Sequence, residues 1–397
     1  MVSFSQILFI ICLTRTVITT FHSNENLVAV VQLFRHGHRT PVTFYTNDPY
    51  SDKIYWGGLG EGQLTGEGKR QQYRLGQFTR QRYGGWLPQK YDKSIFYART
   101  TDVERTHMSA LSNIYGLYPA TTDDIWHPFS DWHPIPVHTA DPKVFNTFPP
   151  FSCKSYYIER SNYLAGNESL AINEKYTKLY RYISHNSGEN VTSLREVHNV
   201  YDCLAAEHSI GLPLPKWAKH IYPQPLSDLD ALYFDSFSHT VKLQRLGTGT
   251  LLFEILKYFD DMTRDPTTSQ KFQMFSGHDY NIAGVLNSLG AFNPPRSVPF
   301  ASSIYFELRK NRNNTYYVNA WFKEQSKLKG IRIKGCEIDC PLDEVKHRLS
   351  KILIDVKTLD LECQENSQFI STVAKEFYDA FNEEFNSKSK SDKQKKI

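Results

Sequence analysis

One segment near the N-terminus constrains the fold more than any other part of the chain. Residues Leu27–Phe34 form a continuous apolar run rich in β-branched side chains, which predicts a strand buried on both faces of a sheet. The run passes directly into the polar sequence Arg35-His36-Gly37-His38-Arg39-Thr40-Pro41. Because ligands of open α/β sheets bind beyond the carboxyl ends of the strands, we expect these side chains to line a binding site.

Later segments continue an alternation of strands and helices. The sequence predicts a helix that residues 64–68 introduce and that ends at about residue 83, and further helices over residues 101–118 and 279–289, with Thr101 as the N-cap of the second. It predicts strands over residues 94–98 and 271–275. This alternation predicts an α/β fold, with a mostly parallel central sheet and helices on both faces. Residues 303–308 and 316–322 predict a hairpin added at the edge of that sheet.

The pattern changes between residues 141 and 238, where no strong strand is predicted and helical stretches alternate with Pro-rich turns. We interpret this span as an inserted, smaller α-helical subdomain that covers the substrate. The α/β domain then comprises residues 21–140 and 239–386. Residues 387–397 contain five lysines and predict a flexible basic tail, with polyanion binding as the alternative.

Residues 1–20 are typical of a secretory signal peptide, because their apolar core Ile7–Leu13 is too short to cross a bilayer. A buried first strand is the alternative. No other stretch reaches the ~18 apolar residues of a transmembrane helix, so we expect no membrane span. These features favour secretion over residence in a lysosome-like lumen. The net charge of +4 is too close to balance for a nucleic-acid-binding protein.

The cysteines and glycosylation sequons are also typical of an oxidising compartment. Cys12 lies in the predicted signal peptide, which leaves five cysteines: Cys153, Cys203, Cys336, Cys340 and Cys363. An odd number predicts a free thiol or a bond between chains. Three Asn-x-Ser/Thr sequons predict N-glycosylation at Asn167, Asn190 and Asn313.

Three predicted strands deliver charged side chains to the same edge of the sheet. The first is followed by Arg35 to Arg39, the second by Arg99 to Thr106, and the third by Ser276-Gly277-His278-Asp279. Arginines bind phosphate through charge-assisted hydrogen bonds and spread the charge of a transferred phosphoryl group. They also favour a neutral imidazole, so His36 is a candidate nucleophile that forms a phosphohistidine. Asp279 is the carboxylic acid available to protonate the leaving alkoxide.

The segment Val28–Pro41 resembles the signature of the histidine acid phosphatase family, a branch of the histidine phosphatases. The likeness extends over nearly the whole mature chain, through Thr101–Thr106 and His278-Asp279 to the C-terminal cysteines. Within the family, the sequence looks most similar to the secreted animal prostatic and lysosomal acid phosphatases. The resemblance implies His36 as the nucleophile and Asp279 as the proton donor. It assigns phosphate binding to Arg35, Arg39, Arg105 and His278.

The same resemblance implies two disulfides, Cys153–Cys363 and Cys336–Cys340. The usual partner of Cys203 is Ser303 in this sequence, which makes Cys203 the odd cysteine. His38 stands where the family usually has Asp or Ala, and we interpret it as tuning of the site. The segment with Trp126 and Trp132 resembles the dimer interface of the animal enzymes and implies a homodimer, with core aromatics as the alternative.

The sequence therefore predicts a secreted acid phosphatase that hydrolyses small-molecule or peptide phosphomonoesters with no metal or other cofactor and no nucleic-acid partner. An acid optimum follows because Asp279 must be protonated to donate, whereas His36 among arginines stays neutral below the ~6.5 of a free imidazole. Two alternatives stay open. One is a metallophosphoesterase with His36 and His38 as ligands, and the other is a non-catalytic binding protein on a phosphatase scaffold. We expect substrate specificity to lie in the insert.

Overall fold

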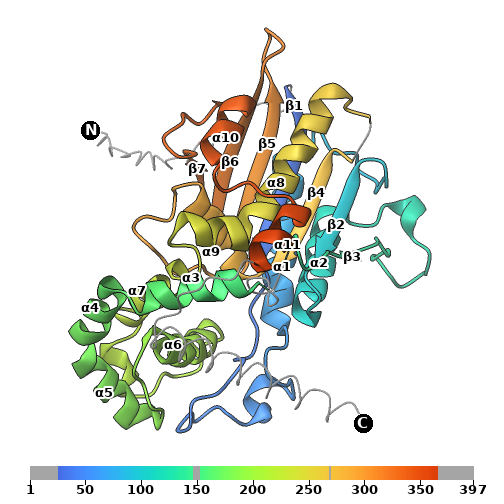
Figure 1. The fold of residues 1–397 in the computed structure, drawn as a ribbon. Helices are drawn as coiled ribbons and strands as arrows, with labels where there is room; N and C mark the ends of the chain where they lie inside the picture. The colour runs from blue at the N-terminus through green and yellow to red at the C-terminus, as the bar shows by residue number, and fades with distance from the viewer. Residues whose placement is uncertain (1–25, 146–152, 268–269, 365–397) are drawn as a thin grey trace, which may run out of the picture.

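The computed structural model describes residues 26–145, 153–267 and 270–364, and its centre is one mixed sheet (Figure 1). The strands are β1 Leu27–Arg35, β2 Phe96–Thr100, β3 His138–Thr139, β4 Phe272–Gly277, β5 Ser303–Lys310, β6 Tyr316–Glu324, β7 Lys327–Ile331 and β8 Cys340–Pro341. Their order is β3-β2-β4-β1-β5-β6-β7, and β8 pairs with β6. The strands from β3 to β1 are parallel, and β5, β6 and β7 extend the sheet in antiparallel pairs.

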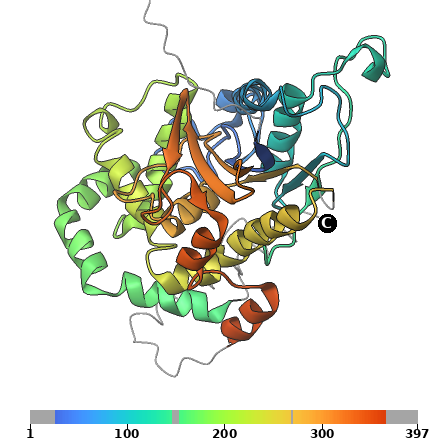
Figure 2. The same cartoon turned by 90° about the horizontal axis from the view of Figure 1, so that it is seen from above.

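Helices cover both faces of the sheet, as the sequence predicts (Figure 2). On one face lie α1 Gly66–Tyr83 and α2 Glu104–Leu117, and on the other lie α8 Val241–Arg264 and α9 Asp279–Ser288. This arrangement confirms the predicted α/β fold.

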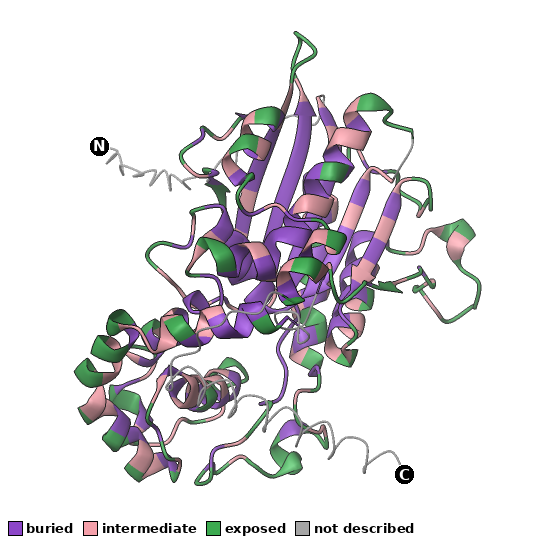
Figure 3. Ribbon diagram, viewed as in Figure 1, coloured by how far each residue is buried: buried purple, intermediate pink, exposed green. Residues whose placement is uncertain are grey.

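Strand β1 shows why two layers of helices are needed. Its side chains alternate between two hydrophobic cores: Val31 and Leu33 pack with α8 and α9, whereas Val30 and Phe34 pack with α1 and α2. All four side chains are fully buried. Figure 3 shows that most residues in the centre of the sheet are buried as well (purple). The burial predicted from the apolar run is therefore confirmed.

The described residues between β3 and α8 form only helices and turns. These helices are α3 Lys154–Leu164, α4 Asn167–Lys175, α5 Thr177–Ser187, α6 Leu194–Ser209, the short 3-10 helix η3 Ala218–His220 and α7 Leu226–Asp235. Side chains of α5, α6 and α7 share a separate hydrophobic core. In Figure 1 this group (green) lies beyond the edge of the sheet at which the chain leaves β1 (blue).

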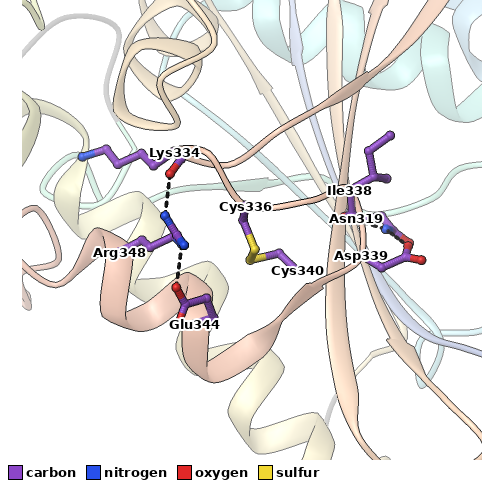
Figure 4. Close-up of a disulfide and its surroundings, with 8 residues drawn as sticks. All are labelled: Asn319, Lys334, Cys336, Ile338, Asp339, Cys340, Glu344 and Arg348. Atoms are coloured by element: carbon purple, nitrogen blue, oxygen red, sulfur yellow. Dashed lines mark hydrogen bonds and ion pairs between the residues drawn. A yellow bond between two sulfur atoms is a disulfide. The ribbon is translucent and has the colours of Figure 1, made fainter.

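The remaining elements are η1 Lys53–Trp56, η2 Thr122–Asp124, α10 Leu342–Leu349 and α11 Val356–Gln364. A disulfide between Cys153 and Cys363 ties the start of α3 to α11, and a second joins Cys336 to Cys340. Figure 4 shows the second disulfide beside Arg348, which bonds the carbonyl of Lys334 at 2.7 Å. Both predicted pairings are confirmed. No helix in the described ranges is long and apolar enough to span a membrane.

Two local predictions need correction. Helix α2 begins at Glu104, and its N-cap is Val103 rather than Thr101. The hydroxyl of Thr101 is instead engaged by the ring of His278 at 2.8 Å. The predicted hairpin exists, but β5 pairs with β1 and β7 follows β6, so the hairpin is not the end of the sheet. Propensity reasoning could not detect either long-range contact.

Candidate active site

The carboxyl ends of three neighbouring strands meet in register and position the predicted site. Arg35 at the end of β1 lies opposite Gly277 at the end of β4, and Thr100 at the end of β2 lies opposite Ser276. The backbone N–H of His36 then donates to the carbonyl of Gly277 at 2.8 Å. This bond fixes His36 beside the residue that follows Gly277, which is His278.

Close packing beneath the site explains the glycine after His36. A Cβ atom at Gly37 would lie 2.2 Å from the carbonyl oxygen of Gly68, in the first turn of α1. The reverse also holds, because a Cβ at Gly68 would lie 2.1 Å from the carbonyl oxygen of His38. These two glycines therefore let the loop after β1 and helix α1 approach each other directly.

The ring of His36 is held in one tautomer. Its Nδ1 atom lies 2.8 Å from the carbonyl oxygen of Gly37. Since a carbonyl only accepts, Nδ1 carries the proton and Nε2 keeps its lone pair. His36 is 1 % exposed, and burial together with the charges of Arg105 and Arg35 holds its pKa well below the ordinary value. The imidazole is therefore neutral at acid pH and has a nucleophilic nitrogen.

His278 faces His36 from the N-terminus of α9. The two ring centroids are 5.4 Å apart in an edge-to-face arrangement. On the far side, Nε2 of His278 lies 2.8 Å from the hydroxyl of Thr101, and Nδ1 lies 3.5 Å from Nη2 of Arg105. Burial and the charges of Arg105 and Arg39 lower the pKa of His278 well below its ordinary value. Two neutral imidazoles thus lie side by side among arginines.

The three predicted phosphate-binding arginines have different partners. Arg35 forms an ion pair with Asp279 at 2.7 Å, and Arg39 forms a two-bond ion pair with Asp202 at 2.8 and 2.9 Å. In the described ranges, Arg105 makes no ion pair with a carboxylate, and burial lowers its pKa to about 9. Arg105 therefore supplies a guanidinium whose charge has no direct counterion, which is the condition that favours a bound anion.

Asp279 occupies the first turn of α9, next to His278. Its Oδ1 atom accepts the backbone N–H of Tyr280 at 2.8 Å, while Oδ2 faces Arg35. The side chain is 15 % exposed, more than the 9 % of Arg35. The carboxyl group is therefore slightly more exposed than the guanidinium with which it pairs.

An aromatic side chain that sequence reasoning missed, Phe300, covers the cluster. The guanidinium carbon of Arg35 lies 4.1 Å from the centre of the Phe300 ring, and the His36 ring lies 5.9 Å from it. Arg35 also donates to the carbonyl of Val298. This stretch before β5 therefore orients Arg35, and only the three-dimensional pairing of β5 with β1 brings it to the site.

The ring of His38 is bonded to the insert and to the residue before α1. Its Nε2 donates to the carbonyl of Ala206 at 2.9 Å, and Nδ1 lies 2.7 Å from the hydroxyl of Thr65. Because both ring nitrogens are used in these bonds, His38 is not available as a ligand in its present conformation. No group of three His, Cys, Asp or Glu side chains in the described part of the chain is arranged to hold a metal ion.

The structure thus brings together all six residues that the sequence assigned to catalysis and phosphate binding: Arg35, His36, Arg39, Arg105, His278 and Asp279. It adds Asp202 and Phe300, for which no local sequence signal exists, and gives Thr101 a contact with His278 in place of the predicted N-cap role. Cys203 is a buried free cysteine. Its Sγ donates to the carbonyl of Thr43 at 2.9 Å, so it contacts the insert-facing loop and is not accessible to a second chain.

Comparison with known proteins gives a family. The model of the histidine phosphatase superfamily (branch 2) matches residues 26–323. Rat lysosomal acid phosphatase is 34 % identical over 358 residues, which cover 88 % of this chain and 82 % of that protein. Rat prostatic acid phosphatase is 31 % identical over 83 % of this chain and 87 % of that protein. Venom acid phosphatase Acph-1 of Apis mellifera is 33 % identical over 78 % of this chain and 81 % of that protein.

Solved structures agree on the fold. The apo form of Hafnia alvei phytase superimposes with a TM-score of 0.65 at 19 % identity, covering 86 % of this chain and 98 % of that one. A phytase from Citrobacter braakii gives a TM-score of 0.61 at 16 % identity, with coverage of 86 % and 100 %. The overall fold is therefore shared with these proteins.

Proposed function

Because the chain belongs to the histidine phosphatase superfamily, branch 2, we propose that it is an acid phosphatase that hydrolyses phosphate monoesters through a phosphohistidine at His36. The observation that carries the proposal is the bond from Nδ1 of His36 to the carbonyl of Gly37 at 2.8 Å, which leaves Nε2 as the nucleophile. The cluster of Arg35, Arg39 and Arg105 supports it, since guanidinium groups bind phosphate oxygens.

The first step transfers the phosphoryl group to the enzyme. Nε2 of His36 attacks phosphorus, the bond from phosphorus to the ester oxygen breaks, and the departing alkoxide takes a proton from Asp279. The guanidinium groups and His278 stabilise charge on the phosphoryl oxygens. Asp279 enters this step as the carboxylic acid and leaves it as the carboxylate, and the bound phosphate takes over Arg35, the partner of Asp279 in the free enzyme.

The second step returns the enzyme to its starting state. Water attacks phosphorus, Asp279 as a carboxylate takes a proton from that water, and the bond from phosphorus to His36 breaks. The products are inorganic phosphate and a neutral imidazole. No step needs a metal ion, because the arginines carry out the charge stabilisation that a metal would otherwise supply.

Acid pH suits both partners in the first step. Asp279 donates only when it is protonated, whereas the lowered pKa of His36 keeps the nucleophile neutral well below the ordinary imidazole range. The two requirements overlap on the acid side. The arginines disfavour a metallophosphoesterase, because they repel a divalent cation. The presence of both a nucleophile and an acid disfavours a non-catalytic binding protein.

We further propose that the protein is secreted and N-glycosylated. The N-terminal sequence and the two disulfides support an oxidising compartment, and the predicted signal peptide lies outside the described residues. Asn167, Asn190 and Asn313 are all exposed, so each sequon is accessible to a glycan. The helical insert at residues 141–238 is proposed to bind the alcohol part of the substrate.

The loop after α2 supports a homodimer. It extends from the body of the molecule (Figure 1) and exposes Phe129 by 93 %, Trp126 by 63 % and Ile125 by 48 %. The alternative of core aromatics is not supported, because these side chains face solvent. An exposed aromatic patch of this kind is typical of a protein interface. Sedimentation of wild type and of Trp126→Ser would test it, since the variant should be monomeric.

The central experiment traps the phosphoenzyme. Rapid quenching with a labelled aryl phosphate at pH 5 should give an acid-labile, base-stable phosphoprotein in wild type and none in His36→Ala. Turnover should resist a chelator and be inhibited by vanadate, which mimics the five-coordinate phosphoryl centre. Loss of turnover on chelation, or a phosphoenzyme that persists in His36→Ala, would overturn the proposal. A panel of aryl, nucleotide, sugar, inositol and lipid monoesters would then define the substrate.

A further inference from the structure

The loop that follows the catalytic motif is fastened to the helical insert. The backbone N–H of Asn47 donates to the carbonyl of Ser187 at 2.8 Å, and Cys203 donates to the carbonyl of Thr43 at 2.9 Å. These contacts place residues 43–50 against the C-terminal end of α5 and one side of α6. The loop and α6 therefore move as one unit only while this interface holds.

The adjoining side of α6 holds the motif that follows β1. Asp202 pairs with Arg39, and the carbonyl of Ala206, four residues later, accepts from His38. Residues four apart lie on one face of a helix, so Asp202 and Ala206 share one face, and Cys203 and Glu207 share the adjoining one. Any change in charge at Glu207 is thus close to the contacts that position Arg39.

Glu207 is buried in an unusual way. The residue is 0 % exposed, and neither carboxylate oxygen has an N–H or O–H donor among the described residues. Its polar neighbour is Asp48, which is 6 % exposed and whose Oδ2 also lacks a donor. The two carboxyl groups are within hydrogen-bond range of each other. Two carboxylates cannot bond to each other without a proton between them.

The surroundings of the pair contain no compensating cation in the part of the chain that the structure describes. The titratable groups that act on it are Tyr45 and Tyr50 from the loop, Cys203 from α6 and Tyr222 from the segment before α7. All four are neutral or anionic. A buried, unpaired carboxylate is costly, and the usual response is protonation.

We propose that Asp48 and Glu207 are positioning residues that share a proton, and that this shared proton fastens the catalytic loop to α6 at acid pH. When the proton is lost, two carboxylates repel each other in the interface, and the loop separates from α6. The integrity of the site then weakens gradually as the pH rises, which adds to the limit that the chemistry of Asp279 sets. The inference rests on the proposed function only where activity is the readout.

The direction of the pH effect follows from the raised pKa values. Burial and the charge of Asp48 raise the pKa of Glu207 from 4.5 to about 9, and burial raises that of Asp48. The folded protein therefore keeps a proton that the unfolded chain loses above pH 4.5. Stability from this pair is fully present below that pH and is lost as the pH rises toward 9. One retained proton raises the unfolding equilibrium constant about tenfold per pH unit.

The test compares the pH dependence of unfolding in wild type, Glu207→Gln and a control. An amide donates permanently to Asp48, so Glu207→Gln keeps the bond without the titration. We expect the ratio of the unfolding equilibrium constant of wild type to that of Glu207→Gln to rise about tenfold for each pH unit between pH 5 and 8. Glu174→Gln, an exposed glutamate of α4 in the same insert, should follow wild type. Taking the difference removes contributions from His36 and His278, whose lowered pKa values act in the opposite direction.

Two further readouts locate the effect. Amide hydrogen exchange of residues 43–50, corrected for the intrinsic rate, should quicken in wild type from pH 5 to pH 8 but not in Glu207→Gln. Activity assayed at pH 5 after incubation at pH 8 should decay in wild type and persist in Glu207→Gln. Parallel pH curves for wild type and Glu207→Gln would overturn the inference, whether or not either protein is active, so its failure is separable from failure of the proposed function.

A second measurement keeps the inference testable if Glu207→Gln does not fold. The infrared spectrum of wild type at pH 6.5 should contain the C=O band of a buried protonated carboxylic acid, and Asp48→Asn should shift or remove that band. A wild-type spectrum without such a band at this pH would overturn the inference.

Discussion

Arg39 and Asp202 form a two-bond ion pair at 2.8 and 2.9 Å, although 163 residues separate them in the chain. The pair joins the catalytic motif to the helical insert and neutralises one of the three site arginines. Asp279 neutralises a second, Arg35, and the charge of Arg105 is left over.

Asp202→Asn should weaken phosphate binding more than the chemical step. The amide keeps one bond to Arg39 but removes the charge that orients it, so we expect KM to rise about tenfold or more while kcat falls less. Loss of the charged partner should also destabilise the protein, toward the lower end of the about 3–5 kcal/mol that broken buried ion pairs cost. Steady-state kinetics and urea unfolding measure both effects. Asp228→Asn, an exposed aspartate of α7, is the control and should resemble wild type.

Thr101 should matter through the ring of His278. Thr101→Val keeps the shape but removes the hydroxyl that lies 2.8 Å from Nε2 of His278. A net hydrogen bond contributes about 0.5–1.5 kcal/mol, so kcat/KM should fall about two- to tenfold. Thr101→Ser retains the hydroxyl and should restore most of the activity. Equal activity of the Val and Ser variants would show that Thr101 does not position His278.

The sequence predicts this site well where the signal is local. The apolar run of β1, the short strands and the residues after each of them are contiguous in the chain, and parallel strands bring their carboxyl ends to one edge by geometry. That is why His36, Arg105 and His278 could be placed at one site without a structure. The two disulfides followed from a family likeness, because spacing alone leaves their connectivity open.

The partners of these residues were not predictable in the same way. Asp202 and Glu207 lie in a helix whose pattern signals only an amphipathic insert, and their role depends on where that helix packs. Phe300 reaches Arg35 because β5 pairs with β1 in the reverse direction. Thr101 has the residue type and location of an N-cap, but a tertiary contact with His278 takes its hydroxyl. In each case a long-range contact decides the role.

Arg105 should control the acid side of the pH profile. Burial and then the charge of Arg105 lower the pKa of both His36 and His278. In Arg105→Gln both pKa values rise toward the ordinary imidazole range, so the fall of kcat/KM at low pH should move to higher pH. Loss of a donor to the transferred phosphoryl group should also lower kcat by about 10²–10³-fold. Arg99→Gln, which removes a guanidinium paired with Glu254, is the control and should leave the acid limb in place. An unmoved acid limb in Arg105→Gln would contradict the prediction.

Cys203 should be a thiol that is present but unreactive. It is fully buried, and burial raises its pKa well above the ordinary value, so little thiolate is available for reaction. A thiol reagent should not label Cys203 in the native protein but should label it in denaturant. Mass analysis of unreduced peptides should recover Cys153–Cys363 and Cys336–Cys340. An intrachain bond to Cys203, or rapid labelling of it in the native state, would contradict this assignment.

The nucleophile and the acid should be separable by leaving group. His36→Ala should abolish turnover of every phosphomonoester, because no phosphoenzyme can form. Asp279→Asn should lose much more rate on an alkyl phosphate, whose alkoxide needs the proton, since general acid help contributes about 10²–10⁴-fold. A nitrophenyl phosphate releases a stable phenolate, so in Asp279→Asn the phosphohistidine should form relatively fast and hydrolyse slowly, visible as a burst. Equal losses on the alkyl and aryl substrates would show that Asp279 is not the proton donor, and Glu104, in the first turn of α2, would be the next residue to test.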